Sequence, residues 1–81
     1  MFKNKNHNSN NLCGKNVRRF RCNNFTNLSQ RMLADRLQLS GLDVDKNAIQ
    51  RIESGQRFVT DIELVALSKA LEVSVDELLV Q

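Results

Sequence analysis

Residues 73–78 read VSVDEL, and this stretch carries the start signal of an α-helix. Ser74 is a favoured N-cap residue, and Glu77 three positions later completes a capping box, in which two otherwise unpaired backbone amides are satisfied. Val73 before the cap and Leu78 four residues after it form a hydrophobic staple, which sets the direction of entry into the helix. The stretch therefore predicts a helix that begins at Val75.

The same start pattern occurs at three earlier places in the chain. The cap residues there are Ser29, Asp45 and Thr60, and the staple pairs are Leu28 with Leu33, Val44 with Ile49, and Val59 with Leu64. Glu63 completes a second capping box behind Thr60, whereas Met32 takes the Glu or Gln position behind Ser29. Four matching starts indicate a chain of short helices.

Two glycines mark where helices end. Gly41 and Gly55 follow the helices that begin after Ser29 and Asp45, and glycine adopts the left-handed conformation that closes a helix at little cost. With Gly41 in that conformation, we expect Leu42 to close back on Leu37 in a Schellman turn.

An amphipathic segment precedes the first of these starts. Leu12, Val17 and Phe20 fall near one face of a helix, and basic side chains occupy much of the rest. The whole pattern predicts five helices, at residues 12–23, 30–40, 46–54, 61–71 and 75–80. The expected core residues are Val17, Phe20, Ala34, Leu37, Ile49, Ile52, Leu64, Leu67, Leu71, Leu78 and Leu79.

The composition agrees with a small helical domain. Eighty-one residues are too few for separate cofactor and substrate domains. The absence of Pro and the presence of only three Gly leave few of the turn residues that many short strands would need. Four Phe without Trp or Tyr disfavour an aromatic platform for single-stranded nucleic acid. We therefore predict an all-α fold with one core.

Charge is distributed unevenly along the chain. Residues 1–27 contain six basic and no acidic residues, whereas residues 28–81 contain six basic and nine acidic ones, so +6 and −3 combine to the net charge of +3. Residues 1–11 are rich in Asn and poor in apolar side chains, so we expect them to form a flexible tail before a domain at 12–81. The basic third suits a polyanion such as nucleic acid, and a solubilising surface is the alternative.

Cys13 and Cys22 lie nine residues apart, so on one helix they point to opposite sides and cannot form a disulfide within it. We expect two half-buried free thiols in a reducing cytoplasm. His7 forms no standard metal-ligand spacing with them, so we predict neither a metal nor another cofactor. The longest apolar run, at residues 64–67, is too short for a membrane span or a signal peptide, and we expect a cytoplasmic protein.

The chain also lacks the parts of a catalytic site. The single histidine, His7, lies in the predicted tail, and no glycine-rich phosphate loop is present. Asp61 and Glu63 are explained by helix capping. We therefore expect no enzyme activity and no small-molecule ligand.

The residues that mark these helices resemble those of the lambda-repressor and Cro-like helix-turn-helix family. The resemblance covers residues 14–79 and depends on LSQ at 28–30, LA at 33–34, the Ile and Glu of 49–53, Gly55 and LEVSVDELL at 71–79. It implies a five-helix DNA-binding domain, with helix 46–54 in the major groove of duplex DNA. Ala34 and Ile49 are fifteen residues apart here, five more than in the commonest members. We expect the extra residues to lengthen the second helix by about a turn and to add a loop at 42–45.

The resemblance also suggests which residues contact DNA. Side chains that can pair with base edges are Lys46, Asn47, Gln50 and Arg51. Matches to phosphate-contacting positions are Ser29, Gln30, Ser54, Gln56 and Arg57. Ser29 is explained equally well as a cap alone, and Arg57 as a solvated loop charge. For the recognition helix, the alternative is an ordinary amphipathic helix with a solvated polar face.

Two further pairs of residues are candidates for an ion pair within the domain and for an arm on the DNA. Arg21 and Glu53 match an ion pair that ties the first helix to the end of the third, the alternative being two surface charges without contact. Lys3 and Lys5 are candidates for an arm that wraps the duplex, with an inert tail as the alternative.

These assignments predict a sequence-specific, double-stranded DNA-binding transcriptional regulator of bacterial or phage type, a repressor that associates with the nucleoid when bound. Members of the family commonly bind two-fold operators as dimers, and apolar residues of helix 75–80 are candidates for a homodimer contact. The alternative is a protein-interaction module on the same fold, such as an antitoxin-like or adaptor protein. Steep weakening of binding by salt favours DNA over a hydrophobic protein partner.

Overall fold

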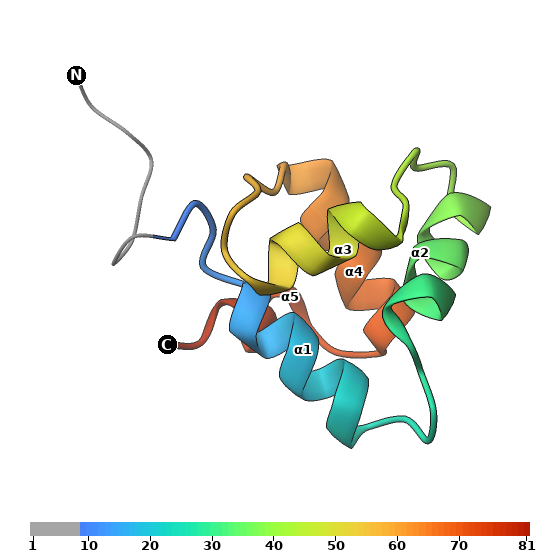
Figure 1. Ribbon diagram of the computed structural model, residues 1–81. Coiled ribbons are helices and arrows are strands. Elements are labelled where there is room, and N and C mark those ends of the chain that lie inside the picture. The colour runs from blue at the N-terminus through green and yellow to red at the C-terminus, as the bar shows by residue number, and fades with distance from the viewer. Residues whose placement is uncertain (1–8) are drawn as a thin grey trace.

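The computed structural model describes residues 9–81, which form five α-helices joined by short loops (Figure 1). The helices are α1 Gly14–Asn23, α2 Gln30–Leu39, α3 Lys46–Glu53, α4 Asp61–Leu71 and α5 Val75–Leu79. The all-α prediction is confirmed, and each helix end lies within two residues of its predicted position. No helix in residues 9–81 is long and apolar enough to cross a membrane. Lys3, Lys5 and His7 lie outside the described residues.

The predicted caps of α2 to α5 are all present. Each cap side chain accepts a hydrogen bond of 2.8–3.2 Å from the backbone amide three residues later. Thr60 and Ser74 form complete capping boxes, with the Glu63 and Glu77 carboxylates accepting from the cap amides. Helix positions are therefore set by contacts within four residues of each start.

Helix α1 begins later than predicted and is capped in another way. The side chain of its N-cap residue, Cys13, makes no capping bond. Asn11 takes over this role, because its Oδ1 accepts from the Gly14 amide at 2.7 Å. The prediction that Leu12 lies on the buried face is wrong: it precedes the helix and is exposed.

Both glycine stops are confirmed. Gly41 and Gly55 have φ of 91° and 81°. The Leu42 amide donates to the Leu37 carbonyl at 3.1 Å, which is the long hydrogen bond of a Schellman turn. Helix α4 ends in the same left-handed conformation with Glu72, at φ 59°, in place of glycine.

The connection from α2 to α3 is held against the domain. Val44 is buried, and Gln38 Nε2 donates to its carbonyl oxygen at 2.8 Å. Leu42 is half-buried against the core. The residues that make this connection long therefore form a packed loop between α2 and α3.

The core lies where the faces of all five helices meet. Helix α1 packs against α3, α4 and α5, and α2 packs against α3 and α4. In Figure 1, α3 crosses the front of the bundle, with α1 below it and α2 to its right. The largest fully buried side chains are Cys13, Val17, Leu33, Leu37, Ile49, Ile52, Leu67, Leu71 and Leu78.

Some burial predictions are wrong. Leu79 is 36% exposed, because Leu78 occupies the inward position of the short α5 and the next residue is turned about 100° away. Cys13 is fully buried and Cys22 is exposed, so the two thiols are not alike. Leu64 and Phe20 are only partly buried against the core.

Candidate nucleic-acid interface

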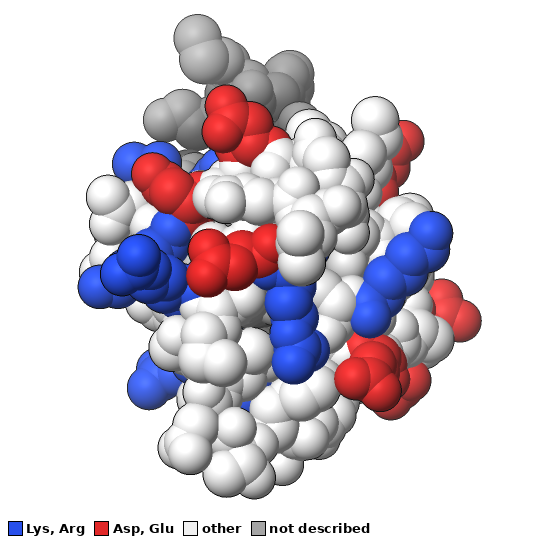
Figure 2. All heavy atoms as spheres, turned by 90° about the vertical axis from the view of Figure 1, so that its right-hand side faces the viewer, with Lys and Arg blue, Asp and Glu red and all other residues white. Residues whose placement is uncertain are grey.

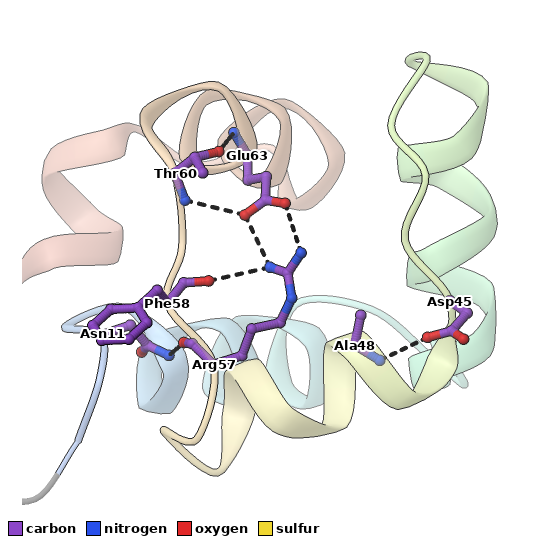
Figure 3. Close-up of polar contacts among 7 residues, drawn as sticks. All are labelled: Asn11, Asp45, Ala48, Arg57, Phe58, Thr60 and Glu63. Atoms are coloured by element: carbon purple, nitrogen blue, oxygen red, sulfur yellow. Dashed lines mark hydrogen bonds and ion pairs between the residues drawn. The ribbon is translucent and has the colours of Figure 1, made fainter.

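Helix α3 has one buried and one exposed face. Ala48, Ile49 and Ile52 are buried and hold the helix on the core. The side chains predicted to pair with bases all lie on exposed positions, namely Lys46, Asn47, Gln50 and Arg51. Asp45 Oδ1 caps the helix by accepting from the Ala48 amide at 2.8 Å, as Figure 3 shows. The helix thus presents four hydrogen-bonding side chains from a fixed backbone.

The start of α2 lies beside the end of α3. Ser29 Oγ accepts from the Met32 amide at 3.1 Å, which uses a lone pair and leaves the hydroxyl hydrogen able to donate. Gln30 Nε2 donates to Glu53 Oε1 at 3.0 Å, and its second amide hydrogen remains able to donate elsewhere. The amides in the first turn of a helix also attract anions. The start of α2 therefore provides several donors next to α3.

Arg21 and Glu53 form the ion pair that the resemblance implies. Arg21 Nε and Nη2 donate to the two carboxylate oxygens at 2.7 and 3.0 Å, and Nη1 donates to the Leu28 carbonyl at 3.0 Å. The Glu53 side chain is only 4% exposed. Hydrogen bonding to Glu53 raises the pKa of the Arg21 guanidinium. Arg21 thus joins α1 to the end of α3, through Glu53, and to Leu28 in the segment before α2.

The loop after α3 contains Ser54, Gln56 and Arg57. Ser54 and Gln56 are exposed, and Ser54 Oγ donates to the Arg51 carbonyl at 3.2 Å. Arg57 points away from them toward α4, where its Nη1 and Nη2 donate to the Glu63 carboxylate at 2.9 and 2.8 Å (Figure 3). Glu63 thus pairs with the Arg57 charge within the domain, and the phosphate contact of Arg57 stays a prediction.

The bond to Arg57 also changes the titration of Glu63. Hydrogen bonding from the guanidinium lowers the pKa of the Glu63 carboxyl below its ordinary value of 4.5, and the backbone amide of Thr60 acts in the same direction. In turn, Glu63 raises the pKa of Arg57. Glu63 therefore has two roles, as the capping-box acceptor of α4 and as the partner of Arg57.

The segment before α1 is bonded to the end of α3 and to the loop after it, which the sequence did not predict. Asn11 Nδ2 donates to the carbonyls of Ile52 and Arg57 at 3.1 and 2.7 Å. The Asn10 amide donates to the Gly55 carbonyl at 2.7 Å. Asn10 and Asn11, which lie in the predicted tail, therefore contact the domain, because their amide groups donate to carbonyls at and beyond the end of α3. An Asn-rich composition alone does not distinguish such anchors from a solvated segment.

The cysteines show no sign of a metal site. Burial raises the pKa of the Cys13 thiol to about 11, so it remains protonated at neutral pH. Within residues 9–81, no group of three His, Cys, Asp or Glu residues could hold a metal ion. Cys13 acts as a small apolar core residue.

Basic and acidic side chains are interspersed on the α2 side of the molecule (Figure 2). That side therefore carries no continuous patch of one sign. Basic side chains gather at the left-hand edge of the same view, which is the side that faces the viewer in Figure 1, where α3 lies.

A family model described as Helix-turn-helix matches residues 26–78, from just before α2 into α5. The chain belongs to this lambda-repressor-like helix-turn-helix family. Members of the family are DNA-binding regulatory domains, with α2 and α3 as the helix-turn-helix pair. The match begins after α1, so Arg21 lies outside it. No curated protein and no solved structure matches the chain.

Proposed function

We propose that this helix-turn-helix protein is a sequence-specific regulator that inserts α3 into the major groove of duplex DNA and represses transcription by occupying an operator. The observation that carries the proposal is the exposed face of α3. Its four polar side chains offer the donors and acceptors that read base edges, and the opposite face is buried.

Phosphate contacts on both flanks of α3 would fix its register in the groove. On one flank, Ser29 and Gln30 offer a hydroxyl and an amide hydrogen at the start of α2. On the other flank, Ser54 and Gln56 are exposed in the loop after α3. We assign Arg57 the role of holding this loop on α4 through Glu63.

The first residues of the chain extend this interface in the proposal. Asn10 and Asn11 are bonded to Ile52, Gly55 and Arg57, so the chain meets the domain beside the loop after α3. Lys3 and Lys5 precede this anchor and would add phosphate contacts as an arm.

A homodimer on a two-fold operator completes the proposal. Leu79 and Val80, at the end of α5, are 36% and 59% exposed. Burying such side chains against a second copy would give the two recognition helices a fixed spacing.

Selection from a randomised duplex pool at near-physiological salt tests the proposal. We expect enrichment of one motif with two-fold symmetry, and loss of enrichment in the double variant Lys46→Ala/Arg51→Ala. The matched control is Arg19→Ala/Lys69→Ala, which removes the same charge from exposed positions outside α3. It should keep the motif.

Other results of the selection would contradict the proposal in different ways. Retention without enrichment would show phosphate attraction without base reading. No retention would favour the protein-interaction module, an antitoxin-like or adaptor protein on the same fold.

A further inference from the structure

Helix α1 carries a row of basic residues to which the interface described above gives no role. Lys15, Arg18 and Arg19 are exposed, and residues 9–27 contain no acidic residue. Neither of the two ion pairs in the described part of the chain involves Arg18. Its charge is therefore available to a partner.

Arg18 lies at a hollow where α1, α2 and α3 meet. The hollow has a volume of about 250 Å³ and is lined by Arg18, Arg21, Gln30, Gln50, Glu53 and Ser54. Gln50 belongs to the exposed face of α3, and Gln30 and Ser54 are both proposed phosphate contacts. The hollow therefore opens beside the surface that would face DNA, and it exceeds the volume of a water molecule severalfold.

The hollow has a positive charge balance. Its one acidic residue, Glu53, accepts hydrogen bonds from Arg21 and Gln30 on both carboxylate oxygens and is nearly buried. Arg21 and Glu53 cancel, so Arg18 leaves one net positive charge. The second amide hydrogen of Gln30, which Glu53 does not use, adds a hydrogen-bond donor. One net positive charge and nearby hydrogen-bond donors suit a single small oxyanion.

We propose that this hollow binds one phosphate of the DNA backbone, with Arg18 as its ion-pairing residue. The inference rests on the proposed function and extends the DNA contact surface onto α1. Because a phosphate contact carries no base information, Arg18 positions the domain on the duplex and leaves the preferred sequence unchanged.

The salt dependence of binding to the selected duplex tests this inference. We expect Arg18→Gln to reduce the log-log salt slope by about 0.9 for each domain bound. The ratio of the binding constant of the unaltered protein to that of Arg18→Gln should then fall about 3.5-fold per domain between 50 and 200 mM salt. The selected motif should stay the same.

Arg19→Gln is the matched control. It removes the same charge from the next residue, whose guanidinium carbon lies 4.8 Å from the Phe20 ring centroid. Arg19 does not line the hollow beside Gln50. Arg19→Gln should leave the salt slope close to that of the unaltered protein. Both variants should unfold at the thermal midpoint of the unaltered protein, because both side chains are exposed.

Neutral methylphosphonate linkages, introduced one at a time into the duplex, identify the contact. One linkage should weaken binding of the unaltered protein and of Arg19→Gln but have no further effect on Arg18→Gln. Equal slopes for the two variants, or additive effects at every linkage, would overturn the inference while specific binding stands. Failure of the unaltered chain to select any motif would instead overturn the proposed function.

Discussion

The two ends of α3 are built in opposite ways. At its N-terminal end, Lys46 and Asn47 are exposed, and only the backbone is fixed, through the Asp45 cap. At its C-terminal end, Glu53 is nearly buried and accepts three side-chain hydrogen bonds. The Ile52 carbonyl accepts from Asn11, a residue 41 positions earlier.

This difference separates two requirements of a recognition helix. Side chains that read bases must be unpaired in the free protein, because groups already satisfied within the domain have less to gain from DNA. Position, however, requires rigid attachment. In this protein the polar attachment lies at Ile52 and Glu53, after the last of the proposed reading residues, and it adds to the burial of Ile49 and Ile52.

Removal of Glu53 should have the largest effect on the attachment of α3. Glu53→Ala leaves the largely buried Arg21 guanidinium without its partner, and we expect a loss of about 3 kcal/mol in the free energy of unfolding. Urea or thermal unfolding measures it. Glu72→Ala, at an exposed position on the turn after α4, is the control and should change stability far less. Equal shifts would contradict the role of the pair.

A double variant tests whether the stability loss comes from an unpaired charge. Glu53→Ala should be destabilising mainly because it leaves the Arg21 charge unpaired. The double variant Arg21→Ala/Glu53→Ala should then lose less free energy of unfolding than the two single variants lose together. Additive losses would mean that each side chain acts on its own.

The close approach of α1 to the end of α3 should be the next most sensitive point. A Cβ at Gly14 would collide with the Ile52 carbonyl oxygen and stand 2.9 Å from Asn11 Oδ1. Gly14→Ala should therefore destabilise the domain by about 2 kcal/mol, although alanine is ordinarily the better helix residue. Chemical unfolding gives the value.

Gly41→Ala provides the matched comparison for Gly14→Ala. A Cβ at Gly41 meets nothing within 4 Å, so its cost arises only from the left-handed backbone at φ 91°. We expect Gly41→Ala to lower the free energy of unfolding by about 1 kcal/mol, which is less than the loss for Gly14→Ala. Stabilisation by Gly14→Ala would show that α1 and α3 are free to separate.

An effect of similar size to that of Gly41→Ala concerns pH and the loop after α3. The pKa of Glu63 is lowered by Arg57, so the unfolded chain takes up this proton at a higher pH than the folded one. The stabilisation is present above the ordinary value of 4.5 and is lost as pH falls through the lower folded value. Glu63→Gln keeps a cap acceptor but removes the charge, and we expect it to cost about 1 kcal/mol at pH 7 and progressively less below about pH 5.

Glu77→Gln distinguishes this effect from capping in general. Glu77 completes the capping box of α5 and, within the described residues, forms no ion pair. Thermal unfolding across the same pH range should therefore show that the stability loss from Glu77→Gln changes less with pH than the loss from Glu63→Gln. A cost of Glu63→Gln that is independent of pH would mean that the Arg57 bond contributes no net stability.

The positions of the helices could be predicted because their signals are local. A cap and the amide it bonds lie three residues apart, and a Schellman turn joins residues five apart. The polar face of α3 could be predicted from helical periodicity, once Ile49 and Ile52 had been assigned to the core. Leu79 and Leu12 were mispredicted because the ends of an amphipathic pattern do not show where a helix leaves the core.

Local sequence signals are enough to specify five short helices and the exposed polar face of α3. The resemblance implied the family, which the helix-turn-helix match confirms. Three features follow instead from the packing of the helices: Asn11 caps α1 and binds the end of α3, Arg57 pairs with Glu63, and Arg18 shares a hollow with Gln50. The physical reason is distance along the chain. Caps and periodicity act within a turn or two of helix, whereas Asn11 reaches carbonyls 41 and 46 residues away, which only the packing of α1 against α3 brings together.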